Sequence, residues 1–230
     1  MIYPAIVKLM IVSQLFFTLS ASQTEFSDPE LLHRVETTQK IVAFTFDDGP
    51  DPLYTKQIVQ QLTSHHAHAT FFVIGRKVAQ YPNIIKYEVE KGNEVGNHSF
   101  SHDLHWSSPS AVQEIKLTQE QVYRATGIYP KYFRPPMGII NPLIRQAAKQ
   151  AHLRIVLWAW DQDTRDWNGR IASSITQHVL DHIHPGDIIL FHDGASKQTN
   201  TVQALKVLLP ALERKQYRVV TISELLQLSK

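Results

Sequence analysis

Residues 41–52 read IVAFTFDDGPDP, and this stretch indicates both the class of fold and the place of a functional site. Its first half, IVAFTF, is a continuous run of aliphatic, aromatic and β-branched residues, which is typical of a strand buried on both faces of a parallel sheet. Two adjacent carboxylates, Asp47 and Asp48, follow directly, and then Gly49 and Pro50. Capping the Gly-Pro turn accounts for one of these acids, so the second carboxylate predicts a chemical role at the end of this strand.

Strand and helix patterns alternate from this point to the C-terminus. The predicted strands are 41–46, 69–75, 94–99, 131–136, 154–160, 186–194 and 217–222. The predicted helices are 53–65, 83–92, 108–127, 141–152, 172–183, 201–216 and 223–230. Because this alternation joins parallel strands by helical crossovers, it predicts an α/β domain with a closed or nearly closed (β/α) barrel of about seven parallel strands. A doubly wound open sheet is the alternative.

The composition of the chain limits the classes of partner and metal site. The 230 residues are 43% hydrophobic and carry a formal charge of +2, which does not point to nucleic acid as a partner. There is no cysteine, which excludes disulfides and Cys-ligated metals, but there are 12 histidines. Any metal must therefore be bound by His, Asp or Glu, a ligand set that suits Zn²⁺.

The N-terminus has the pattern of a targeting segment. In residues 1–22 a lysine precedes the apolar run LMIVSQLFFTL, and small residues follow it, as in a secretory signal peptide. The run is short for a membrane span and contains polar residues, although an uncleaved anchor is the alternative. Residues 23–38 are polar and predict a linker before the domain at 39–230. We therefore expect an exported protein, in the periplasm, at the cell surface or secreted, with no stable membrane span after signal cleavage.

Polar and titratable side chains recur just after the predicted strands. They are Asp47, Asp48, Asn97, His98, His102, Arg134, Asp161, Asp163, Asp166, His192 and Asp193. In parallel α/β folds the residues that carry the chemistry gather at the C-terminal ends of the strands. The pattern therefore predicts that these side chains share one active site.

Two histidines and one carboxylate are candidates for a metal site. His98 and His102 are four residues apart, and a helical turn would point both side chains the same way. With Asp48 they would form a facial His-His-Asp triad, which leaves positions on Zn²⁺ for water and substrate. Adjacent residues of an extended strand point to opposite sides, so we expect Asp47 to remain free as a base.

Two further residues have both a chemical and a structural interpretation. His192 ends the apolar run IILFH, where it is either a general acid or a core histidine bonded to the backbone. Arg134 precedes two prolines, where it is either a surface cation or the bidentate partner of a carboxylate.

The remaining histidine cluster and the tryptophans favour structural roles. The HHAH run at 65–68 is interpreted as a helix terminus and loop rather than a metal site. Trp158 and Trp160 alternate along one predicted strand, so we expect them in the core. Trp106 lies in a predicted loop, where it either packs or stacks on a sugar ring.

Five short motifs occur in order along the chain: TFDDGP (45–50), HSFSH (98–102), RPP (134–136), DTRDW (163–167) and ILFH (189–192). They resemble the motifs of the polysaccharide deacetylases, the carbohydrate esterase family 4 or NodB-homology enzymes. The resemblance runs from about residue 40 to 225. It implies the family's distorted (β/α) barrel and a metal-dependent hydrolase.

The implied reaction removes N-acetyl groups from N-acetylglucosamine units of peptidoglycan, chitin or chitooligosaccharide and releases acetate. An O-acetyl esterase acting on xylan or another acetylated glycan is the alternative. A silent glycan-binding module and a hydrolase of small cyclic amides are more distant alternatives. The preferred glycan and the oligomeric state stay open.

The resemblance also implies a role for each matched residue. Asp47 corresponds to the catalytic base and His192 to the acid. Arg134 corresponds to the residue that holds the base, and Asp166 to the one that orients the acid. The implied ligands of one divalent metal are Asp48, His98 and His102. Zn²⁺ is the expected ion, with Co²⁺ and Mn²⁺ as alternatives.

Three residues are implied to contact the substrate. Trp167 and Leu190 match residues that line the pocket for the acetyl methyl group. Met137 stands where the family usually has an aromatic residue, whose backbone N–H helps to bind the oxyanion. Because a backbone donor survives a side-chain change, we expect Met137 to alter the wall of the sugar groove more than the chemistry.

Overall fold

The computed structural model describes residues 31–194 and 198–229, and the predicted signal peptide lies outside them. The strands are β1 (Leu31–Leu32), β2 (Ile41–Gly49), β3 (Thr70–Val73), β4 (Glu94–Asn97), β5 (Tyr132–Phe133), β6 (Arg154–Val156), β7 (Ile188–His192) and β8 (Arg218–Val220). The α-helices are α1 (Tyr54–Ser64), α2 (Gly75–Gln80), α3 (Pro82–Glu90), α4 (Ser108–Thr126), α5 (Pro142–Gln150), α6 (Ala172–His182), α7 (Thr199–Arg214) and α8 (Ile222–Leu228). Two 3-10 turns are η1 (Pro136–Gly138) and η2 (Asp166–Asn168).

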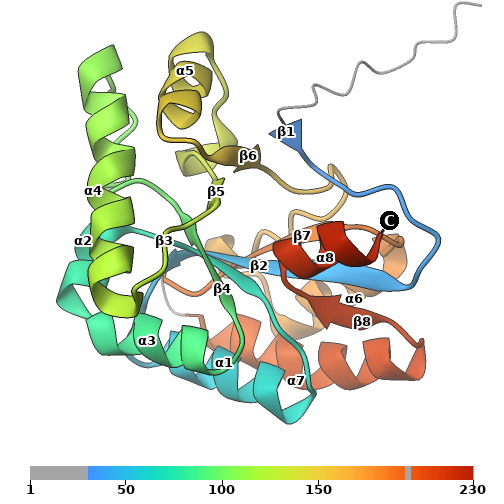
Figure 1. The fold of residues 1–230 in the computed structure, drawn as a ribbon. Coiled ribbons are helices and arrows are strands. Elements are labelled where there is room, and N and C mark those ends of the chain that lie inside the picture. Colours follow the sequence, from blue (N-terminus) through green and yellow to red (C-terminus); the bar gives the residue numbers. More distant parts are fainter. Residues whose placement is uncertain (1–30, 195–197, 230) are drawn as a thin grey trace, which may run out of the picture.

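The strands form one sheet in the order β1-β6-β5-β4-β3-β2-β7, and β8 pairs with the N-terminal part of β2. Every ladder between these strands is parallel. The helices lie around the strands, and α3, α1 and α7 form a row along the lower side of Figure 1. The structure therefore confirms the parallel α/β architecture predicted from the alternation of elements.

The sheet closes through an irregular segment that follows β6 and runs along β7. The N–H of Ala159 donates to the carbonyl of Ile188 at 2.9 Å, and the N–H of Leu190 donates to the carbonyl of Gln162 at 3.0 Å. A loop thus takes the place of a regular ladder between β6 and β7. The result is the predicted distorted barrel.

The side chains of β2 alternate between two apolar clusters. Ile41 and Ala43 belong to a cluster that fills the interior of the barrel, and seven of the strands contribute side chains to it. Val42, Phe44 and Phe46 pack outward against the helices. Because both faces of β2 are buried, its sequence is apolar, apart from Thr45, until the strand reaches the carboxylates.

The structure corrects two predictions about the elements around the site. β6 ends at Val156, so Trp158 and Trp160 lie beyond the strand. Trp158 is partly buried and packs against the interior cluster, as predicted. Trp160 is 80% exposed, and its predicted burial is wrong. The predicted linker also contributes to the domain, because β1 pairs with β6 and the side chain of Leu32 is buried.

Candidate active site

A pocket lies where the C-terminal ends of β2, β4, β6 and β7 meet. It is lined by Asp47, Asp48, His98, His102, Met137, Gly138, Trp158, Asp163, Trp167, Leu190 and His192. Eight of the ten site residues predicted from the sequence are among them. The other two, Arg134 and Asp166, are buried behind its wall and contact the residues that line it.

Asp47 and Asp48 reach this pocket together, against the expectation that they point to opposite sides of the strand. The pairing of β2 with β3 is irregular between Asp47 and Gly49, and Asp48 has a left-handed φ of 73°. This break in the strand turns the second carboxylate toward the first. Nε2 of His98 lies 3.8 Å from Asp47 Oδ2 and 3.4 Å from Asp48 Oδ1, which places both acids beside one imidazole.

His98 and His102 converge on Asp48, but no helical turn brings them there. Nε2 of His102 lies 3.2 Å from Asp48 Oδ1. The segment is a loop after β4 in which Ser99 has a φ of 67° and His102 a φ of 61°. Asn97 Oδ1 accepts the N–H of Ser99 at 2.9 Å, and Ser99 Oγ accepts the N–H of His102 at 3.0 Å. Side-chain turns of this kind, rather than helix periodicity, set the direction of the second imidazole.

The donor atoms of this cluster fit a metal ion. One ligand atom from each of Asp48, His98 and His102 lies within 4.8 Å of the others. The carbonyl of Arg134 lies 2.7 Å from His98 Nδ1, which makes Nδ1 the protonated nitrogen and leaves the Nε2 lone pair for a cation. Asp48 Oδ1 is buried and has no hydrogen-bond partner among the described residues. A buried carboxylate oxygen of this kind calls for a cation.

The charge on Asp48 is strongly favoured. Burial alone would raise the pKa of this carboxyl group, but the imidazoles of His102 and His98 outweigh it and hold the pKa well below its usual range. Asp48 is therefore ionised at neutral pH, as a metal ligand must be.

Arg134 holds Asp47 from below the pocket floor. The guanidinium is fully buried, and its Nη1 donates to Asp47 Oδ1 at 2.8 Å and to Thr45 Oγ1 at 2.9 Å. Its Nη2 and Nε donate to the carbonyl oxygens of Leu157 and Val156 at 2.6 and 3.2 Å. Arg134 is thus the partner of a carboxylate and not a surface cation, but the pair is not bidentate, because backbone carbonyls take the other donors. Only one oxygen of Asp47 is engaged by Arg134, so the second one is available to the pocket.

His192 is oriented by Asp166 from the opposite wall. Asp166 Oδ1 lies 2.8 Å from His192 Nδ1, and Asp166 Oδ2 accepts the N–H of His192 at 2.9 Å and the hydroxyl of Thr201 at 2.7 Å. Burial would lower the pKa of His192, but its hydrogen bond to Asp166 and the charge of Asp166 raise it to about 9. His192 is therefore a protonated donor at neutral pH, and Nδ1 is the nitrogen that Asp166 holds.

Met137, Trp167 and Leu190 complete the rim and the wall of the pocket. Met137 has a φ of 57° in η1, and its side chain is exposed. Trp167 lies in η2 and is partly exposed, whereas Leu190 of β7 is buried beneath the pocket. The pocket therefore combines polar side chains from the ends of β2, β4 and β7 with the apolar side chains of Met137, Trp167 and Leu190.

Three supporting residues were not among the site residues predicted from the sequence. Thr201 is on α7, and it meets Asp166 only because the fold brings α7 to η2. Thr45 occupies the inward register of β2 between Arg134 and the carbonyl of Ile189. Lys77 of α2 donates from Nζ to the carbonyls of Asp48 and Gly194, each at 2.8 Å. Lys77 and Thr201 lie outside the five motifs, whereas Thr45 begins TFDDGP, and the β2 register would place it on the same face as Asp47.

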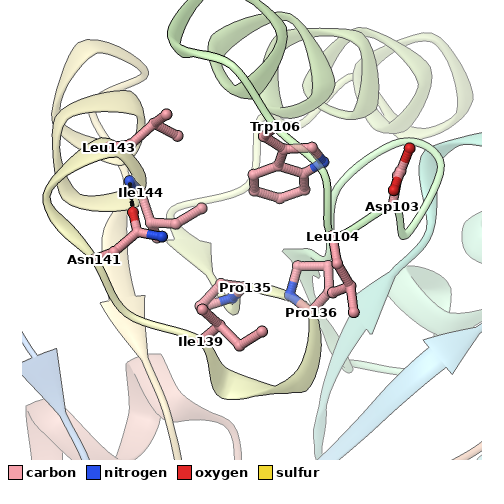
Figure 2. Close-up of a pocket in the computed structure, with 9 residues that line it drawn as sticks. All are labelled: Asp103, Leu104, Trp106, Pro135, Pro136, Ile139, Asn141, Leu143 and Ile144. Atoms are coloured by element: carbon pink, nitrogen blue, oxygen red, sulfur yellow. Dashed lines mark hydrogen bonds between the residues drawn. The ribbon is translucent and has the colours of Figure 1, made fainter.

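Two features outside the catalytic pocket have structural roles. Figure 2 shows the indole of Trp106 facing Pro135 and Pro136 in a small apolar pocket beside the site. Its stacking on Phe133 favours the packing interpretation of Trp106. In the 65–68 run, His65 pairs with Glu213, and the cluster does not form a metal group among the residues that the structure describes.

Comparison with known proteins agrees with this geometry. A family model described as "Polysaccharide deacetylase" matches residues 34–156, which is more than half of the chain. The chain belongs to the polysaccharide deacetylase family.

Two relatives in this family are named as deacetylases of glycans that contain N-acetylglucosamine. A peptidoglycan-N-acetylglucosamine deacetylase of Bacillus cereus is 41% identical over 196 residues, which are 84% of this chain and 91% of that protein. A chitooligosaccharide deacetylase of Bradyrhizobium is 36% identical over 198 residues, which are 80% of this chain and 90% of that protein.

A solved structure shares the fold along most of both chains. It is a peptidoglycan N-acetylglucosamine deacetylase in complex with 4-naphthalen-1-yl-N-oxidanyl-benzamide, with a TM-score of 0.80 and 34% identity over 85% of this chain and 92% of that one. This similarity supports the distorted barrel described above. Within the described part of the chain, no helix is long and apolar enough to cross a membrane.

Proposed function

We propose that this protein removes N-acetyl groups from N-acetylglucosamine units of a glycan, either peptidoglycan or a chitin-like polymer, and releases acetate. The observation that carries the proposal is one pocket that holds a carboxylate, Asp47, a protonated imidazole, His192, and a three-residue cluster suited to a metal. Hydrolysis of an amide needs a base for water, an acid for the leaving amine and stabilisation of the oxyanion. The named relatives act on such glycans, which supports this substrate class.

Asp48, His98 and His102 would hold one divalent metal, and Zn²⁺ suits their nitrogen and oxygen donors. When bound there, the metal would polarise the acetamide carbonyl and lower the pKa of a bound water to about 7. Co²⁺ and Mn²⁺ are alternatives for the same ligands.

Asp47 acts as the base that takes the proton from the attacking water. Arg134 fixes the carboxylate through Oδ1, so that Oδ2 is the oxygen beside His98 and the pocket. The contact with Arg134 also prevents rotation of the carboxylate away from the water. A base whose geometry is fixed in advance contributes by orientation as well as by proton transfer.

His192 acts as the acid that donates a proton to the departing amine. Asp166 holds Nδ1, so the other ring nitrogen, Nε2, carries the proton that is transferred. The backbone N–H of Met137 would stabilise the negative charge that develops on the carbonyl oxygen. Water thus gives its OH to the acetyl carbon and its proton to Asp47. The C–N bond then breaks, and the amine leaves with the proton from His192.

Trp167 and Leu190 would enclose the methyl group of the acetyl substituent. If the two side chains close around the methyl group when substrate binds, they would favour acetyl over longer acyl groups, because a packed wall does not accept added volume without strain. Such an enclosure does not by itself separate N-acetyl from O-acetyl groups. The site of action is proposed to be outside the cell membrane, which the signal-peptide pattern of residues 1–22 supports.

The test is acetate release by the metal-stripped protein, with and without added Zn²⁺. The substrates are N-acetylglucosamine oligomers, peptidoglycan and O-acetylated xylan. Zn²⁺-dependent release from the first two supports the proposal. Release from xylan alone would replace it with an O-acetyl esterase, and no release from any substrate by the metal-loaded protein would indicate a silent binding module.

A further inference from the structure

A second hollow lies beside the catalytic pocket and shares a wall with it. Met137, Gly138 and Trp158 line both hollows. The second hollow continues past these residues to His33, Leu157 and Trp160. A polymer whose reacting unit occupies the first hollow would therefore have its next unit at the mouth of the second.

Trp160 is the most unusual residue of this second hollow. Its side chain is 80% exposed, more than any other large hydrophobic residue in the described part of the chain. Most exposed apolar groups on a protein surface are smaller or scattered, and a tryptophan in a hollow next to an active site is characteristic of a binding surface.

The indole of Trp160 is held in place from one side. The ring of His33 stacks on it with 4.8 Å between centroids and 23° between planes. His33 is itself fixed, because its Nδ1 lies 3.2 Å from the carbonyl oxygen of Trp158. One face of the indole is thus supported while most of the side chain is open to solvent, which makes it a preorganised platform.

The backbone beneath this platform is part of the sheet. β1 pairs with β6, and the N–H of Leu157 donates to the carbonyl of Leu32 at 2.8 Å. His33 and the segment that bears Trp160 are therefore anchored next to each other by regular hydrogen bonds. Two segments that are far apart in the sequence build the platform together.

We propose that this second hollow binds the sugar that neighbours the deacetylated unit, and that the pyranose ring of that sugar stacks on Trp160. The inference rests on the proposed function, since it takes the substrate to be a chain of linked hexosamines. The C–H face of a hexosamine ring is apolar, and its edge carries hydroxyl groups that stay in water, which matches an aromatic face at the surface. The shared wall at Met137 favours a neighbouring unit of one chain over an unrelated ligand.

This platform predicts a dependence of activity on chain length. An N-acetylglucosamine dimer can leave the second hollow empty, whereas a pentamer fills it in most of its productive registers. In W160A, kcat/KM for the pentamer should fall about tenfold, the size of loss typical of a truncated aromatic anchor. The ratio of kcat/KM for the pentamer to that for the dimer should fall with it, and W160F should keep most of the ratio.

Tyr129 provides a matched control. It is also an exposed aromatic residue stacked on a neighbouring ring, that of Tyr123, but it precedes β5 and so lies at the opposite end of the strands. Y129A should leave both kcat/KM values unchanged. A W160A protein with the chain-length ratio of the unaltered protein would overturn the proposal.

Binding can be measured without turnover. In an Asp47→Asn background, the pentamer should change the tryptophan fluorescence, and the additional substitution W160F should reduce that change to the part that arises from Trp158 and Trp167 in the catalytic pocket. If acetate is never released but the Trp160-dependent change is present, the deacetylase function fails and the sugar subsite stands. If acetate is released and W160A changes neither the kinetics nor the fluorescence titration, the subsite fails and the function stands.

Discussion

The Nζ atom of Lys77 lies 2.8 Å from the carbonyl oxygen of Asp48, and it also lies 2.8 Å from the carbonyl oxygen of Gly194. One ammonium group from α2 thus joins two segments of the site. The first is the end of β2, which bears the proposed metal ligand Asp48, and the second is the segment that follows His192, the last residue of β7. The left-handed φ of 73° at Asp48 needs support of this kind, because a non-glycine residue rarely adopts it.

Replacing Lys77 by methionine should loosen this connection. Lys77→Met keeps the length of the side chain but removes both charged hydrogen bonds, each worth roughly 1.5–3 kcal/mol in favourable cases. We expect a loss of about 1–3 kcal/mol in the free energy of unfolding by urea and a fall of about tenfold in kcat. Lys86→Met on α3 is the control, since Lys86 is exposed and pairs only with Glu90 at 3.9 Å. Equal kcat in the two variants would exclude a positioning role for Lys77.

Variants of the two adjacent carboxylates, Asp47 and Asp48, should differ in bound metal and in kcat. Asp48→Ala removes a proposed ligand, so the purified protein should lose bound metal when measured by elemental analysis. Asp47→Asn should keep the metal, because Asp47 is held by Arg134 instead, but it should lose about 10²–10⁴ in kcat. Metal retained by the alanine variant, or near-normal turnover by the asparagine variant, would refute the corresponding assignment.

The pH profile should reveal the pairing of His192 with Asp166. Asp166 is the main group that raises the pKa of His192 to about 9 against the effect of burial. Asp166→Asn removes that negative charge, so the pKa of His192 should fall. Because the acid must be protonated, the alkaline limb of kcat should move to lower pH, with the largest loss of activity on the alkaline side of neutrality. Thr201→Val keeps the carboxylate and should shift the limb much less, and equal shifts in the two variants would argue against the charge of Asp166 as the cause.

The regular elements follow local rules and were predictable. The helix predicted to stop at Gly127 ends there as α4, and Gly127 has a left-handed φ of 75°. The helix predicted to begin at Asn141 does so as α5, with Asn141 Oδ1 accepting the N–H of Ile144 at 2.9 Å. In each case a capping residue at the helix end satisfies backbone hydrogen-bonding groups, so the boundary can be predicted from the local sequence.

The precise directions of the site residues were not predictable in the same way. The conformations of Asp48 and His102 are left-handed, which no periodicity indicates. They are supported by contacts from Lys77 of α2 and from Ser99. Local alternation rules therefore predicted which residues gather at the strand ends, but gave the wrong reason for how the ligands converge. The exposed position of Trp160 was missed for a related reason, because β6 stops before the alternation of its tryptophans begins.

Glu88 provides a prediction about stability that is independent of catalysis. It lies on α3 and is fully buried, and neither of its carboxyl oxygens has a hydrogen-bond partner in the part of the chain that the structure describes. Burial, together with the nearby charge of Asp193, raises its pKa well above the usual range. Between the ordinary glutamate pKa of about 4.3 and this raised value, the folded state binds more protons than the unfolded state. The free energy of unfolding should therefore fall as pH rises through this interval.

Glu88→Gln removes the titrating group and should flatten this dependence. At pH 8 the variant should be more stable than the unaltered protein by roughly 1–3 kcal/mol, the cost of a buried group without a partner, and the difference should shrink toward pH 4. Urea unfolding at a series of pH values measures it. Glu90→Gln on the same helix is the control, because Glu90 is exposed and should change the curve little. Parallel stability curves for Glu88→Gln and the unaltered protein would show that Glu88 is not the group that loses its proton.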